Sequence, residues 1–92
     1  MTNDDVRAAV LRVLMRIAPE TDPAQLKPHL SLREQLDIDS MDFLNFAIGL
    51  HEEFHVEVPE ADYPKLLTID GCVNYLMAAA ENQGGTSAEA ST

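Results

Sequence analysis

Apolar residues recur at helical spacing in three stretches of this 92-residue chain, and that pattern most constrains its fold. The first stretch begins after Thr2, a residue suited to capping a helix, and ends before Pro19. The second begins at Asp39 and runs to about Phe54, and the last begins after Thr68. Each stretch is amphipathic and must bury its apolar side. The sequence therefore predicts an all-α bundle with three main helices.

The segments between and after these stretches predict the rest of the architecture. Residues 18–38 contain three prolines and isolated leucines, which indicates a long ordered loop between the first and second helices. One short helix is expected near residues 60–66. Residues 82–92 are small and polar, which favours a disordered C-terminal tail. We therefore expect residues 1–81 to form a single domain.

The composition narrows the class of protein. The formal net charge of −10 argues against nucleic acid and anionic membranes as partners. No apolar stretch approaches the roughly 18 residues that a membrane-spanning helix needs. The one cysteine, Cys72, excludes an internal disulfide and a four-cysteine zinc site, and it fits a reducing compartment. We expect a cytoplasmic monomer that does not insert into a membrane.

Acidic residues dominate the middle of the chain. Between Glu34 and Asp62 there are nine Asp and Glu residues and no Lys or Arg. Such a field steers basic protein surfaces toward that segment. A solvated acidic face without a partner explains the charge equally well, so charge alone leaves both interpretations open.

The second predicted helix carries two apolar stripes. The first has the spacing of a normal core stripe and comprises Phe43, Phe46, Ala47, Leu50 and Phe54. The second comprises Met41, Leu44 and Ile48 and lies on an adjacent face. One helix of a small bundle cannot easily bury both stripes, so the second is a candidate surface for docking a partner. A wide core stripe in a well-buried helix is the alternative.

Ser40 stands at the expected start of the second helix, between two acids that can cap it, Asp39 and Asp42. A serine at a helix start usually forms only local hydrogen bonds, so its position alone proves nothing. The neighbouring sequence is more specific. In order and spacing, five segments resemble the motifs of acyl carrier proteins, in which Asp-Ser-Leu opens the second helix: Ser31–Leu36, Leu36–Asp42, Leu50–Phe54, Val56–Pro59 and Thr68–Val73. The resemblance covers roughly residues 4–80.

The resemblance implies a carrier of cargo rather than an enzyme. A phosphopantetheinyl transferase would attach 4′-phosphopantetheine from coenzyme A to Ser40, with Asp39, Met41 and Asp42 around it. The thiol of this arm would hold acyl intermediates as thioesters for fatty-acid, polyketide or related biosynthesis. Acyl-loading and acyl-processing enzymes with basic surfaces would dock on Met41, Leu44, Ile48, Glu52 and Glu53. The acyl chain would lie between the second and last helices, against Phe46, Leu50, Phe54 and Val73.

Three residues depart from the pattern of this family. Asp37 stands where the family usually has Gly, so the turn before the serine is expected to differ. Asn45 and His51 occupy helix positions where an acid is common, which indicates a specialised carrier. Two alternatives stay open: a helical interaction module that never receives the arm, and an aminoacyl carrier.

Patterns typical of enzymes and metal sites fail on their context. His51 to His55 match H-E-x-x-H, but the sequence offers no third zinc ligand at the expected spacing. A calcium loop starting at Asp37 lacks the glycine and the final glutamate of an EF-hand. Ser40 lacks the G-x-S-x-G context of a hydrolase nucleophile. We therefore expect neither catalysis nor a metal centre.

Overall fold

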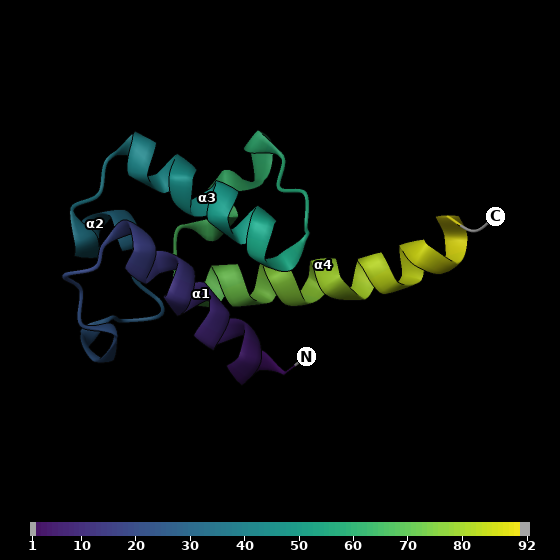
Figure 1. Ribbon diagram of the computed structural model, residues 1–92, viewed down its shortest axis with the longest axis horizontal. Coiled ribbons are helices and arrows are strands. Elements are labelled where there is room, and N and C mark those ends of the chain that lie inside the picture. Colours follow the sequence, from purple (N-terminus) through teal and green to yellow (C-terminus); the bar gives the residue numbers. More distant parts are fainter. Residues whose placement is uncertain (1, 91–92) are drawn as a thin grey trace.

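The computed structural model describes the backbone of residues 2–90 and the side chains of residues 2–80. Three main helices form the bundle: α1 (Asn3–Ile17), α3 (Ser40–Phe54) and α4 (Ile69–Ala90) (Figure 1). Three short elements join them: the 3₁₀ helix η1 (Pro23–Gln25), the helix α2 (Leu32–Leu36) and the 3₁₀ helix η2 (Glu60–Leu66). The expected all-α fold is confirmed, including the short helix at residues 60–66.

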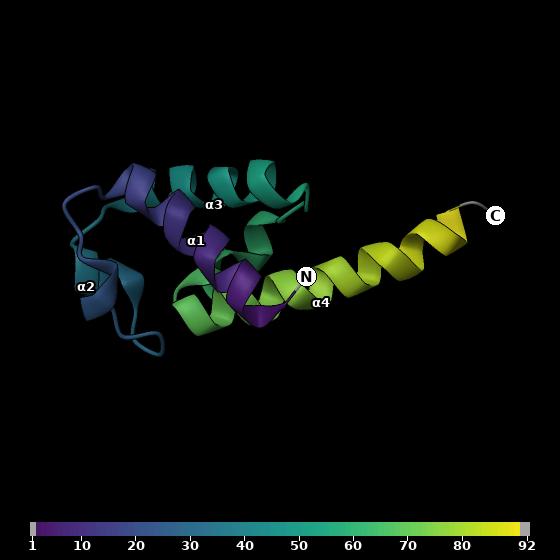
Figure 2. The same cartoon turned by 60° about the horizontal axis from the view of Figure 1, so that its bottom comes forward.

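Helix α1 lies against both α3 and α4, and the two views of the ribbon show it crossing the start of α4 (Figure 2). Its start is fixed by a capping box, in which Thr2 Oγ1 accepts from the Asp5 N–H and Asp5 accepts from the Thr2 N–H. Five residues of α1 are buried: Val6, Ala9, Val10, Val13 and Leu14. They meet the buried side chains of α3 and α4, and this contact forms the core.

The segment between α1 and α3 is tied to the bundle by backbone hydrogen bonds. The Leu32 N–H donates to the Leu67 carbonyl at 2.7 Å, and the Asp70 N–H donates to the Pro28 carbonyl at 3.0 Å. Leu32 is fully buried and anchors α2. The sequence predicts the loop but not α2, because a helix of five residues is too short to show helical periodicity.

Helix α4 begins after Thr68, whose hydroxyl accepts from the Gly71 N–H at 2.8 Å, as the sequence predicts. Its backbone continues as a helix through Ala90, beyond the other helices, where the sequence predicts a tail (Figure 1). The side chains from residue 81 onward and residues 91–92 lie outside the described part of the structure. The domain boundary after residue 81 therefore stays a prediction. In the described part, no helix combines the length and apolar character that crossing a membrane requires.

Candidate functional site

Helix α3 begins at Ser40, as the sequence predicts. Asp39 accepts from the Asp42 N–H at 2.8 Å, and Asp42 accepts in return from the Asp39 N–H at 3.4 Å. This capping box satisfies two backbone donors at the positive end of the helix dipole. The side chain of Ser40 is exposed beside it. A nucleophilic hydroxyl is thus held at a rigid helix start, open to a large partner.

The turn before Ser40 is made by Asp37, which ends α2 in the left-handed conformation with φ 52° and ψ 40°. Glycine adopts this conformation without steric cost, whereas a side chain adds strain that is smaller for Asp and Asn than for other residues. The backbone therefore makes a turn that suits glycine, although an aspartate occupies it. Ile38 is buried directly after this turn and anchors the approach to α3.

Arg33 is a site residue that sequence reasoning missed. Its Nη2 group, carried by α2, donates to Ser40 Oγ at 3.4 Å. The available signal was its place in the charge pattern, since Arg33 is the last basic residue before the acidic middle of the chain. The contact depends on α2 folding back toward the start of α3, which the periodicity does not predict.

A groove of about 490 Å³ opens beside Ser40. Its lining is mainly apolar and comes from α2, α3 and the η2 region: Arg33, Ser40, Phe43, Leu44, Glu60, Tyr63, Pro64 and Leu67. The rings of Phe43 and Tyr63 meet edge to face, with centroids 6.4 Å apart. An arm attached at Ser40 therefore has an apolar surface next to its point of attachment.

The expected cargo residues belong to the core and not to this groove. Phe46 and Leu50 are fully buried, Val73 is 5% exposed, and Phe54 packs against the same core from its edge. Phe46, Leu50 and Val73 belong to one core cluster with buried residues of α1, and Phe54 packs against that cluster. These side chains therefore pack against one another in the core, and other residues line the groove at Ser40.

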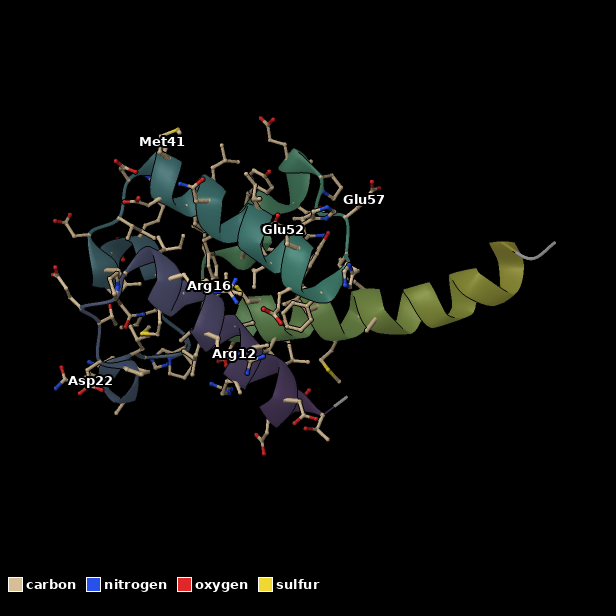
Figure 3. The ribbon with its side chains drawn as sticks, in the orientation of Figure 1. Arg12, Arg16, Asp22, Met41, Glu52 and Glu57 are labelled. Carbon is tan, nitrogen blue, oxygen red and sulfur yellow. The ribbon has the colours of Figure 1, made fainter. Side chains whose placement is uncertain are left out.

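The second apolar stripe of α3 is largely open to solvent. Met41 is 64% exposed and projects away from the bundle at the start of α3, and Ile48 is 44% exposed (Figure 3). Leu44 is half-buried between them and also lines the groove. The stripe is not a widened core stripe, and the helix presents it beside Ser40.

The neighbouring acids Glu52 and Glu53 face different surroundings. Glu52 is exposed on α3. Glu53 pairs with two arginines of α1, at 3.3 Å from Arg16 and 3.8 Å from Arg12 (Figure 3 labels both arginines and Glu52). The structure therefore places Glu52 with the open stripe and commits Glu53 to holding α1 and α3 together.

The end of α3 separates the two histidines of the H-E-x-x-H pattern. His55 lies after the helix in a left-handed conformation, with φ 55°. The Nδ1 atom of His51 lies 2.8 Å from the Val56 carbonyl oxygen and is engaged in closing the turn. The two rings therefore do not share one helix face, which that zinc motif requires.

Fold, exposed serine and groove together match a carrier that bears a prosthetic arm. The family model for the phosphopantetheine attachment site matches residues 4–76. The chain belongs to the acyl carrier protein family, whose members are non-catalytic carriers of acyl groups on phosphopantetheine. Members of this family have two kinds of partner, a phosphopantetheinyl transferase and acyl-processing enzymes.

Individual relatives agree with the family match. The acyl carrier protein of Campylobacter jejuni subsp. jejuni serotype O:23/36 is 36% identical over 75 residues, covering 82% of this chain and 91% of that protein. The acyl carrier protein of Rubrobacter xylanophilus is 28% identical over 74 residues, covering 77% and 91%. A solved structure of the acyl carrier protein from Enterococcus faecalis matches with a TM-score of 0.68 at 25% identity, covering 86% of this chain and 99% of that one.

Proposed function

We propose that Ser40 is the residue that receives 4′-phosphopantetheine, with Asp39, Met41 and Asp42 forming its immediate surroundings. The observation that carries this proposal is the exposed Oγ at the capped start of α3, at the edge of an apolar groove. A helix N-terminus favours the negative charge that a phosphodiester adds. The two capping acids hold this helix start in one conformation and present the hydroxyl to a basic transferase.

The exposed stripe of α3 is the proposed docking surface for partner enzymes. It consists of Met41, Leu44 and Ile48, with Glu52 as its acidic companion. Exposed apolar side chains at the centre with acids at the rim are suited to partners with basic surfaces. Glu53 acts on docking only indirectly in this proposal, because its carboxylate is paired with α1.

The groove beside Ser40 is the proposed path of the arm and the nearest part of its cargo. Phe43, Leu44, Tyr63 and Leu67 supply its apolar lining. Cargo in this proposal is an acyl thioester of fatty-acid, polyketide or related biosynthesis. A longer acyl chain reaches the core residues Phe46, Leu50, Phe54 and Val73 only if α3 and α4 separate, because these residues now pack closely. A cytoplasmic monomer, expected from the sequence, completes the proposal.

Mass spectrometry after incubation with coenzyme A and a broad-specificity transferase tests the attachment site. The wild-type protein should gain one phosphopantetheine group, and Ser40→Ala should gain none. Ser31→Ala is the matched control, since Ser31 precedes α2 and its side chain makes no capping bond. A wild-type protein that stays unmodified would favour the interaction module instead. Modification of Ser40→Ala would place the arm elsewhere.

A further inference from the structure

We propose that Arg33 is a positioning residue for the arm: its guanidinium binds the phosphodiester formed at Ser40 and holds the base of the arm at the mouth of the groove. The inference rests on the proposed attachment at Ser40. Arg33 belongs to α2, whereas Ser40 belongs to α3, so the contact joins two separate helices.

The first support is geometric. Arg33 Nη2 already lies 3.4 Å from Ser40 Oγ, the atom to which the phosphate would be bonded. Helix α2 is a fixed base for this contact, since Leu32 is fully buried and its N–H donates to the Leu67 carbonyl. Gln35 adds bonds from its side chain to the backbone of Lys27 and Leu30. The guanidinium therefore extends from an anchored turn toward the modified atom.

The second support is the distribution of ion pairs. Arg7, Arg12, Arg16 and Lys65 each pair with a carboxylate. Within the described part of the chain, Lys27 and Arg33 form no salt bridge, although Glu34 directly follows Arg33 in sequence. Arg33 instead donates to the neutral hydroxyl of Ser40. An arginine left without a carboxylate partner beside a hydroxyl is suited to an anion that arrives there, and its fork of N–H groups matches phosphate oxygens.

The third support is the charge that the modification adds. A phosphodiester at Ser40 places a negative group next to the capping carboxylates of Asp39 and Asp42. Like charges this close repel one another. Of the described residues lining the groove, Arg33 is the one cation, and it shares that lining with Ser40. Its charge offsets the repulsion on the groove side, which directs the arm toward Phe43, Leu44 and Tyr63 rather than into solvent.

A thermodynamic cycle tests the inference. Attachment of the arm is one change in this cycle, and the Arg33→Gln substitution is the other. Lys27→Gln is the matched control, because it removes an equal charge from an exposed residue outside the groove. Urea unfolding of the unmodified and modified forms gives the coupling between the two changes. For an exposed ion pair we expect the arm to cost the Arg33→Gln protein about two- to five-fold more in its folding equilibrium constant than it costs wild type. High salt should abolish this coupling.

Phosphorus-31 NMR of the modified proteins gives a direct readout at the phosphodiester. The resonance should move in Arg33→Gln, move less in Arg33→Lys, and stay unchanged in Lys27→Gln. Should all four modified proteins share one resonance and show no coupling, the inference is overturned while attachment at Ser40 stands. Failure of the wild-type protein to gain the arm at all would instead overturn the proposed function, and mass spectrometry distinguishes the two failures.

Discussion

Gly49 of α3 lies directly against Val13 of α1, so that a Cβ atom built at Gly49 would come within 2.6 Å of Val13 Cγ1. Val13 is 1% exposed, and its β-branched side chain has essentially one rotamer available in a helix. The Val13 side chain therefore cannot move aside. The absence of a side chain at Gly49 is therefore what lets α1 and α3 approach closely at this level of the core.

Gly49→Ala should destabilise the protein, against the usual effect of this substitution in a helix. Alanine favours a helix over glycine by about 1 kcal/mol, whereas overpacking a core costs about 1–3 kcal/mol. We expect a net loss of about 1 kcal/mol in the free energy of unfolding, measured in urea. In a Val13→Ala background the same change should be neutral or stabilising. A higher midpoint for Gly49→Ala in the wild-type background would contradict the close contact.

Asp37→Gly should stabilise the protein through the turn before Ser40. An L-residue in the left-handed region costs roughly 1–2 kcal/mol, and less when it is Asp, while the greater freedom of glycine in the unfolded chain cancels part of the gain. We expect a net increase of up to about 0.5 kcal/mol in the free energy of unfolding. Asp37→Val should lower stability, since β-branched residues fit this conformation poorly. Equal midpoints for the glycine and valine variants would show that the turn is not strained.

Tyr75→Phe should change the pH dependence of stability at both ends of the pH range. The Tyr75 hydroxyl donates to Asp62 Oδ2 at 2.8 Å, which holds the pKa of Asp62 below its ordinary value of 3.8. The unfolded chain therefore binds the Asp62 proton more tightly than the folded protein does. The stabilisation from this hydrogen bond is present above about pH 3.8 and is lost as pH falls through the lower pKa of the folded state. Tyr75→Phe should flatten this acid limb.

At alkaline pH the same pair acts through Tyr75. Burial, and then the bond to Asp62, raises the pKa of Tyr75 from 10.0 to about 12. Its contribution is complete below pH 10 and disappears as pH rises toward 12. Melting temperatures across pH check both limbs, with Tyr63→Phe as a control that removes a different hydroxyl. If the melting temperature of Tyr75→Phe falls at acidic pH as it does in wild type, the Tyr75–Asp62 pair is not the cause of that fall.

Cys72 should stay unreactive in the folded protein. Its side chain is fully buried, its S–H donates to the Leu66 carbonyl at 3.3 Å, and burial raises the pKa of the thiol from 9.0 to about 12. A thiol with so little thiolate reacts slowly. With a disulfide reagent, the unmodified protein should therefore show no rapidly reacting thiol. The protein bearing the arm should show one rapidly reacting thiol, that of the arm. Cys72→Ala with the arm should keep that fast thiol, and its loss there would show that the reactive group was Cys72.

The sequence predicted the parts of the fold that are encoded locally. The start of α3 follows from Asp39 and Asp42, whose capping geometry needs only three residues of context. Arg33 and Glu53 could not be assigned from periodicity, because their partners lie on other elements and depend on how these pack. The same holds for Phe46 and Val73: their spacing shows that they face inward, but only packing distinguishes a closed core from a cargo channel.

Glu52→Gln and Glu53→Gln remove equal charges from adjacent residues and should have different effects. Glu52 is exposed beside the open stripe, so its loss should lower the transferase kcat/KM at low salt and leave unfolding unchanged. Glu53 pairs with Arg12 and Arg16, so its loss should cost about 0.5–1 kcal/mol of stability, as exposed ion pairs do.

Ile48→Ser should lower the same kcat/KM at both low and high salt, because an apolar contact is not screened. The three variants thus separate the charged from the apolar part of docking. A transferase that responds equally to Glu52→Gln and Glu53→Gln would show that it senses only the net charge of the carrier, and the exposed stripe of α3 would then have no particular role in recognition.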